Sequence, residues 1–165
     1  MDGDSLPVSA FVGCADGQFE LGASAYEKRG VAVVVPHWDE TKCIQCNQCA
    51  YVCPPTATIR PFAMTEDEAA AAPEATRTLD AMGPKAKGMK FTMAVSPLDC
   101  MGCTNCVKVC PKGALEMVPT EQEMDQQPVW DYMVENVSEK KELIAANVKG
   151  SQFKQPYLEF SGSCA

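Results

Sequence analysis

Short apolar runs separated by turn residues dominate the hydrophobic pattern of the chain. Residues 31–35 read V-A-V-V-V, five apolar residues of which four are β-branched, and this run predicts a buried strand that stops at Pro36. Residues 58–60 and 115–118 each follow a Cys-Pro step closely and are short strand candidates. Residues 89–95 alternate loosely between apolar and polar and predict a further strand.

Helical patterns are confined to two regions. Residues 66–72 begin with three acidic residues and continue with four alanines, a composition that favours a helix because early negative charge complements the helix dipole. Pro73 should interrupt this helix, and a second short one is predicted for residues 74–81. Residues 128–137 place apolar side chains at helical spacing, and Pro128 suits a first turn. Strands and helices together predict an α+β fold.

Charge and composition narrow the function classes. The chain has 165 residues and a formal net charge of −8, which argues against nucleic acid as a partner because such binding needs a basic surface. No run of eighteen apolar residues exists, and the first eleven residues lack the features of a secretory signal. We therefore expect a cytoplasmic protein with no membrane or nucleic-acid partner.

The chemistry lies in a repeated cysteine motif. The chain has ten cysteines, a density that in a reducing compartment indicates metal or redox chemistry rather than disulfides. Two runs follow the pattern C-x2-C-x2-C-x3-C-P, and the second begins 57 residues after the first. Their cysteines are Cys43, Cys46, Cys49 and Cys53 in the first run, and Cys100, Cys103, Cys106 and Cys110 in the second.

This spacing suits a four-iron, four-sulfur cubane. Three cysteines at spacing three can wrap a loop around one cluster, while the fourth lies a helical turn later and points away, toward a second cluster. The predicted ligand sets are therefore crossed: Cys43, Cys46, Cys49 and Cys110 for cluster one, and Cys100, Cys103, Cys106 and Cys53 for cluster two. Zinc is a weaker alternative, because zinc sites use paired CxxC knuckles separated by a dozen or more residues.

The pair of motifs resembles the bacterial two-cluster ferredoxins, a family whose fold is a small α+β module with pseudo-two-fold symmetry. The flanking stretches are more specific. They are A-Y-E-K-R-G-V-A-V-V-V-P-H-W before the first motif, S-P-L-D-C-M-G-C at the second, and K-G-S-Q-F-K-Q-P-Y-L-E-F-S-G-S-C-A at the end of the chain. Together they resemble the family of pyruvate:ferredoxin (flavodoxin) oxidoreductases from about Leu6 onward.

That resemblance implies a fragment of a larger enzyme. Residues 1–35 would be a linker region named for Glu27, Lys28 and Arg29, residues 36–119 the ferredoxin-like domain with an inserted helical segment, and residues 120–165 the connection to an absent thiamine diphosphate domain. The family uses thiamine diphosphate, magnesium, coenzyme A and three cubanes to oxidise pyruvate in anaerobic metabolism. Electrons pass to ferredoxin or flavodoxin, so the implied partners are that carrier and the remaining domains of the enzyme.

The resemblance also assigns the end of the chain. Cys164 matches the first cysteine of a CxxC pair that holds the third cluster, and the chain stops at Ala165 before the second, so we expect an unpaired thiol and no third cluster. No catalytic residue is predicted, and this chain alone should not catalyse the overall reaction. A standalone ferredoxin-type electron carrier is the alternative function. His37 and Cys14 are interpreted as a satisfied histidine and a free structural thiol.

Overall fold

A computed structural model describes residues 3–18, 28–54 and 58–143 of the chain. The strands are β1 (Val34–Trp38), β2 (Ile59–Met64), β3 (Leu79–Asp80), β4 (Lys90–Val95) and β5 (Leu115–Pro119), and the α-helices are α1 (Gln48–Tyr51), α2 (Glu66–Ala70), α3 (Asn105–Val109) and α4 (Gln126–Asn136). Short 3-10 helices occupy Gly3–Ser5, Val8–Cys14, Glu40–Lys42, Pro84–Ala86, Thr120–Gln122 and Lys141–Leu143. This confirms the mixed helix and strand content of the predicted α+β fold. No helix in these described ranges is long and apolar enough to cross a membrane.

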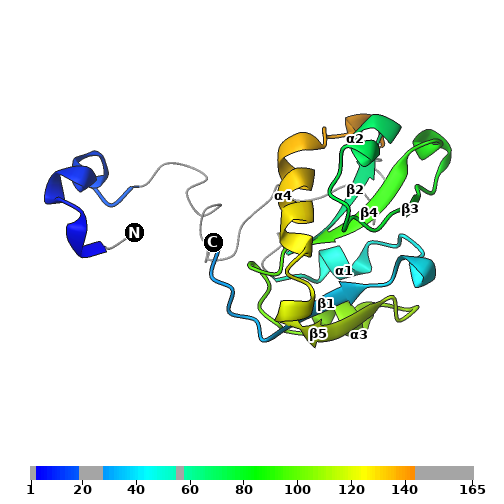
Figure 1. Ribbon diagram of the computed structural model, residues 1–165, viewed down its shortest axis with the longest axis horizontal. Coiled ribbons are helices and arrows are strands. Elements are labelled where there is room, and N and C mark those ends of the chain that lie inside the picture. The colour runs from blue at the N-terminus through cyan, green and yellow to red at the C-terminus, as the bar shows by residue number, and fades with distance from the viewer. Residues whose placement is uncertain (1–2, 19–27, 55–57, 144–165) are drawn as a thin grey trace.

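The strands form two antiparallel sheets. β1 pairs with β5 in a two-stranded sheet, and β4 lies between β2 and β3 in a three-stranded sheet. Figure 1 shows α4 running beside the three-stranded sheet and α3 close to β5, while residues 3–18 lie apart from both sheets. The strands predicted at residues 58–60, 89–95 and 115–118 are confirmed as β2, β4 and β5.

The predicted strand at residues 31–35 is wrong in position. Strand β1 begins at Val34 and continues through Pro36 to Trp38, while the side chains of Val31 and Val33 are exposed. Two backbone hydrogen bonds flank β1: Thr120 N donates to Val33 O, and Asp39 N donates to Ala114 O. The odd-numbered residues of β1 are therefore the ones that are hydrogen-bonded to β5. The nitrogen of Pro36 therefore faces away from β5, and its missing N–H interrupts no bond of the ladder.

Both faces of the three-stranded sheet are buried, which explains the apolar character of its strands. One face contributes Ile59, Phe91, Met93 and Val95 to a core shared with Trp38 and with cysteines of both motifs. The other face packs Met64 and Ala94 against Val129, Trp130 and Met133 of α4. Ring pairs support each core, with Trp38 edge-on to Phe91 at 6.1 Å and Phe62 edge-on to Trp130 at 6.2 Å. The helix predicted at residues 128–137 is thereby confirmed as α4.

The second helix predicted between the motifs, at residues 74–81, is wrong. That segment contains β3 instead, which pairs Leu79 with Phe91 and Asp80 with Lys90 of β4. Leu79 also packs against the core shared by the two cysteine motifs. Tertiary pairing with β4 therefore overrides the local helical preference of this segment.

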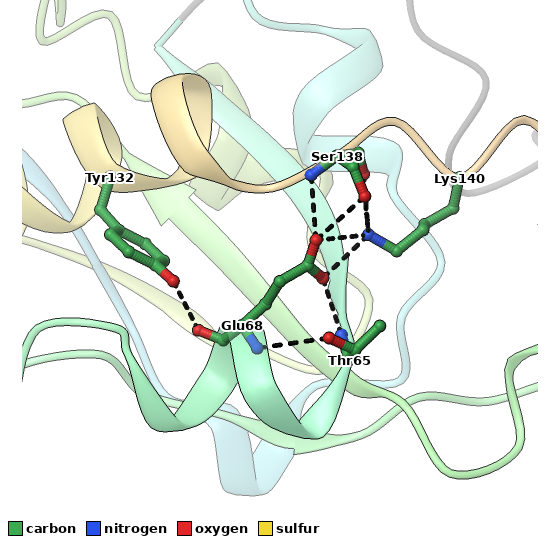
Figure 2. A network of polar contacts seen from close by, with 5 residues as sticks. All are labelled: Thr65, Glu68, Tyr132, Ser138 and Lys140. Carbon is green, nitrogen blue, oxygen red and sulfur yellow. Dashed lines mark hydrogen bonds and ion pairs between the residues drawn. The ribbon is translucent and has the colours of Figure 1, made fainter.

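A polar network joins α2 to the segment that follows α4 (Figure 2). Thr65 and Glu68 form a capping box, in which each side chain bonds the other residue's backbone N–H at 3.2 and 2.8 Å. The Glu68 carboxylate also accepts from Ser138 N at 3.1 Å and from Lys140 Nζ at 2.8 and 2.9 Å. Tyr132 of α4 donates its hydroxyl to the Glu68 carbonyl at 2.7 Å.

This network changes the titration of Glu68 and the expectation for the end of the chain. Burial by itself would raise the pKa of the Glu68 carboxyl, but Lys140 and the N–H groups of Thr65 and Ser138 outweigh it and lower the pKa to about 2. The sequence beyond Ser138 is polar and poorly patterned, which predicts a segment that is extended, frayed or packed on a symmetry mate. As far as Leu143 the structure differs, because Lys140 is bound to Glu68 and residues 141–143 form a 3-10 turn. The remainder of that prediction lies outside the described residues.

Candidate metal centres

The structure brings cysteines of both motifs together around two cavities. One cavity is lined by Cys43, Cys46 and Cys49 of the first motif and by Cys110 of the second. The other is lined by Cys100, Cys103 and Cys106 of the second motif and by Cys53 of the first. Each grouping has the composition of one predicted crossed ligand set. None of the nine described cysteines forms a disulfide.

Apart from the cysteines, the cavity walls are mostly apolar. The first cavity has Trp38, Met93 and Leu115 in its wall, and the second has Pro36, Ile59 and Met117. A wall of this kind offers few competing donors and leaves the cysteine sulfur atoms as the strongest ligands available, which is the soft donor set that an iron–sulfur cluster takes. The residues present therefore fit a cubane in each cavity.

Matching backbone conformations shape the two cysteine loops. The second residue after the first cysteine is left-handed in both motifs, with φ of 54° at Gln45 and 66° at Gly102. The fourth residue after it is also left-handed, with φ of 61° at Asn47 and 66° at Thr104. Non-glycine residues rarely adopt this conformation, so three of the four positions store backbone strain. The turns direct three cysteines of each motif toward one cavity.

Backbone N–H groups point at the sulfur atoms in both loops. Gln45 N lies 3.4 Å from Cys43 Sγ, and at the equivalent place Gly102 N lies 3.3 Å from Cys100 Sγ. Ala114 N lies 3.2 Å from Cys110 Sγ. Donors at these positions stabilise anionic sulfur, and they tune a cluster's reduction potential when one is bound.

Burial dominates the titration of the interior thiols. Desolvation, joined by repulsion from neighbouring cysteines, raises the pKa of Cys49 well above its usual range and that of Cys106 to about 12. Desolvation also raises the pKa of the Cys53 and Cys100 thiols. These cysteines are therefore thiols in the metal-free chain, and a metal that binds them must displace their protons.

Two residues, one inside the first motif and one in contact with it, carried no signal in the sequence pattern. Gln45 donates its side-chain amide to the Asp80 carbonyl at 2.8 Å and accepts from Met82 N at 2.8 Å. It thereby joins the cysteine loop to residues 65–87, which separate the two motifs and are called the inserted segment from here on. Arg60 is buried in β2, donates to the Ala50 carbonyl at 3.2 Å, and its charge lowers the pKa of Cys53 against the effect of burial. The one hint of such a role in the sequence was the position of Arg60, a charged residue inside the otherwise apolar strand β2.

The remaining sequence candidates fall outside the two cavities. His37 Nδ1 lies 2.6 Å from Glu123 Oε1, and Arg77 holds the same carboxylate with two bonds of 3.0 and 3.1 Å, so the histidine is satisfied as expected. Cys14 lies in the 3-10 helix Val8–Cys14, distant in sequence from both motifs. Cys164 and Glu27 lie outside the described residues.

Two family models match parts of the chain. Residues 42–114 match the family described as a 4Fe-4S dicluster domain. Residues 1–32 match the EKR family, which is described as a domain of unknown function.

Along its whole length the chain is similar to one segment of the pyruvate:ferredoxin and pyruvate-flavodoxin oxidoreductases. It is 50% identical to the pyruvate:ferredoxin oxidoreductase of Moorella thermoacetica over all of this chain and 14% of that protein. It is 48% identical to the pyruvate-flavodoxin oxidoreductase of Klebsiella pneumoniae over 99% of this chain and 14% of that protein. The mitochondrial NADP-dependent pyruvate dehydrogenase of Euglena gracilis is 43% identical over 98% of this chain and 9% of that protein. The chain thus spans about one seventh of the first two relatives.

Proposed function

We propose that this chain is the electron-transfer module of a pyruvate:ferredoxin or pyruvate-flavodoxin oxidoreductase. The observation that carries the proposal is the pair of cavities, each lined by three cysteines of one motif and one of the other. The ligand sets are Cys43, Cys46, Cys49 and Cys110 for cluster one, and Cys100, Cys103, Cys106 and Cys53 for cluster two. Each cluster, when bound, accepts and releases one electron at a time.

The chain's own residues hold and insulate these groups. Thiolates at the eight motif positions supply the ligands, and the N–H groups of Gln45, Gly102 and Ala114 hydrogen-bond the sulfur atoms. Cys49 on α1 and Cys106 on α3 belong to one buried core, and these two helices contact each other. Closely placed sites favour electron transfer between the two clusters. The matching conformations of the two cysteine loops support a pseudo-two-fold relation between the two halves of the ferredoxin-like domain.

The parent enzyme supplies the rest of the proposed function. Residues 1–35 are proposed as its linker region, residues 36–119 as the two-cluster domain and residues 120–165 as the connection to a thiamine diphosphate domain. Thiamine diphosphate, magnesium and a third cluster, with Cys164 among its ligands, would belong to the complete enzyme. The proposed partners are the other domains and an external ferredoxin or flavodoxin. A cytoplasmic location is part of this proposal because cysteine-rich redox sites require a reducing compartment.

Iron and acid-labile sulfide per chain, measured on anaerobically prepared protein, test the proposal. About eight of each are expected, with a broad visible absorption that dithionite bleaches. The substitutions Cys110→Ser and Cys53→Ser should each disturb a different cluster, since each removes one ligand contributed by the opposite motif. Cys14→Ser is the matched control and should leave the iron content unchanged. Zinc in place of iron, or no loss in either ligand variant, would refute the proposal.

A further inference from the structure

The end of the region that matches a domain of unknown function lies against the cluster-two loop. Residues 28–34, called the strap from here on, run alongside residues 96–102, which lead into and include Cys100. Gly30 N donates to the Leu98 carbonyl at 2.9 Å, and Ala32 packs with Val35 and Cys100 in one buried apolar cluster. A Cβ atom on Gly102 would lie 3.3 Å from the Val34 carbonyl oxygen, so the strap and the loop are in close contact.

One ion pair joins the strap to the residue before the cluster-two ligand. Lys28 Nζ bonds the carboxylate of Asp99, whose side chain is 1% exposed, whereas that of Lys28 is 26% exposed. Asp99 is held in place by two further bonds, because its carboxylate accepts from Ser96 Oγ at 2.5 Å and its carbonyl from Thr58 Oγ1 at 3.1 Å. A carboxylate buried to this degree requires a compensating charge, which Lys28 provides from 71 residues away.

We propose that Lys28 is a positioning residue for cluster two: its ammonium holds Asp99 and balances that buried charge, and so sets the reduction potential of the cluster. This inference rests on the proposed function, because it takes Cys53, Cys100, Cys103 and Cys106 as the ligands. It assigns a role to the end of the EKR region, namely to hold one cluster loop and adjust its electrostatics.

The sign of the effect follows from the charges. Reduction adds a negative charge to cluster two; the Asp99 carboxylate beside Cys100 opposes that addition, and the Lys28 ammonium favours it. Removing the Lys28 charge should therefore lower the potential of cluster two, whereas removing the Asp99 charge and leaving the ammonium should raise it. A unit charge about 12 Å away at an effective dielectric constant near 20 changes the reduction equilibrium about tenfold, which is 59 mV for one electron.

The test is a redox titration of the cluster-loaded chain followed by electron paramagnetic resonance. Lys28→Met should lower one of the two midpoint potentials by about 59 mV, which corresponds to a tenfold change in the reduction equilibrium. Asp99→Asn should raise the same midpoint potential. The double variant should return close to the parent value, and Lys28→Arg, which keeps the charge, should match the parent. The Cys110→Ser protein, which retains cluster two, identifies which midpoint belongs to it.

A matched control removes the same charge at an exposed site. Lys141 pairs with Glu139 at 3.5 Å, and both side chains are at least half exposed, so Lys141→Met should shift neither midpoint measurably. If the Lys28→Met protein loses iron and cannot be titrated, the Asp99→Asn protein still tests the inference, because the midpoint potential of its cluster two should rise. Equal shifts of both clusters, shifts of one sign in both single variants, or no shift would overturn the inference. Each of these results would leave the proposed function intact as long as the parent chain binds about eight irons, whereas low iron in the parent would refute the proposed function itself.

Discussion

Gln45 and Gly102 occupy the same place in the two cysteine motifs and share a left-handed backbone, yet they use it differently. Gly102 leaves room for the strap, whose Val34 carbonyl would lie 3.3 Å from a Cβ at that position. Gln45 accepts the strained conformation and uses its amide to bond the backbone of the inserted segment. One repeated loop is therefore covered by two unrelated segments, the strap on cluster two and the insertion on cluster one.

Gly102→Ala should destabilise the protein and reduce iron loading at cluster two. The new methyl group would meet Val34 O and the Ala32 side chain at 3.3 and 3.6 Å, and φ of 66° disfavours any residue with a Cβ. Left-handed strain alone costs about 1–2 kcal/mol, and the contact adds to it. Gly88→Ala is the control, because its φ is 85° and nothing lies within 4 Å of its Cβ position. Chemical unfolding should show a larger loss for Gly102→Ala, and equal losses would contradict the close contact.

Gln45→Ala should loosen the inserted segment where it meets the first motif. The substitution removes both side-chain bonds of 2.8 Å and leaves the backbone strain of the loop in place. A bond of this kind contributes about 1 kcal/mol, so hydrogen exchange at the Met82 amide should accelerate about three- to tenfold. Gln45→Gly removes the same bonds and relieves the strain, and it should show the same acceleration. The exposed Gln48→Ala should show none, and unchanged exchange in the Gln45 variants would contradict this role.

Arg77→Met should be strongly destabilising because it removes the cation that bonds the buried Glu123 carboxylate twice, and the remaining contact with His37 Nδ1 at 2.6 Å compensates that carboxylate less well. The Glu123 side chain is only 4% exposed and bonds Arg77 at 3.0 and 3.1 Å. Breaking a buried pair from one side costs about 3–5 kcal/mol, whereas an exposed pair contributes less than about 1 kcal/mol. The control is Lys90→Met, whose partner Asp80 is 88% exposed. Unfolding in guanidinium chloride measures the loss of stability in the Arg77→Met and Lys90→Met proteins. The double variant Arg77→Met with Glu123→Gln should recover part of the stability that Arg77→Met loses.

The Glu68 network should stabilise the fold at neutral pH and weaken in acid. The folded pKa of Glu68 is lowered from the model-compound value of 4.5 to about 2, so its contribution is complete well above pH 4.5 and is lost as the pH falls toward 2. After allowance for solvent screening this contribution is about 1–2 kcal/mol. The difference in unfolding free energy between the parent chain and Glu68→Gln should therefore shrink between about pH 5 and pH 2. A difference that is constant over that range would contradict the lowered pKa.

Sequence patterns correctly predicted helices and strands where the residues of the element itself determine its structure. The three acidic residues and alanines at residues 66–72 became α2, although the helix ends at Ala70. The cysteines of the two repeated motifs line the two cavities, while their assignment as cluster ligands stays a prediction. Strand β1 was misplaced because Pro36 suggests a stop, and only the register with β5 reveals that its nitrogen faces away from the partner strand.

Interactions between distant residues could not be predicted in this way. Lys28 and Asp99 are separated by 71 residues, and neither stands in a motif that would link them. The residues 74–81 became β3 through pairing with β4 and contact with Gln45, which outweigh the helical preference of the segment. The left-handed backbone at Gln45, Asn47 and Thr104 had no glycine to mark it, because the loop geometry imposes that conformation on residues that rarely adopt it.

The pairing of β1 with β5 has a consequence for synthesis of the chain. Val34 faces Pro119, so the first strand must wait for 85 more residues before its partner leaves the ribosome. At about 5–20 residues per second this wait lasts roughly 4 to 17 s. For most of it the cysteines of the first motif are outside without a second motif to meet, because each matching cysteine follows 57 residues later. The nascent first half is therefore the stage at which its thiols are most open to oxidation or to the wrong metal. With the proposed crossed ligand sets, assembly of either cluster has to follow translation of the second motif.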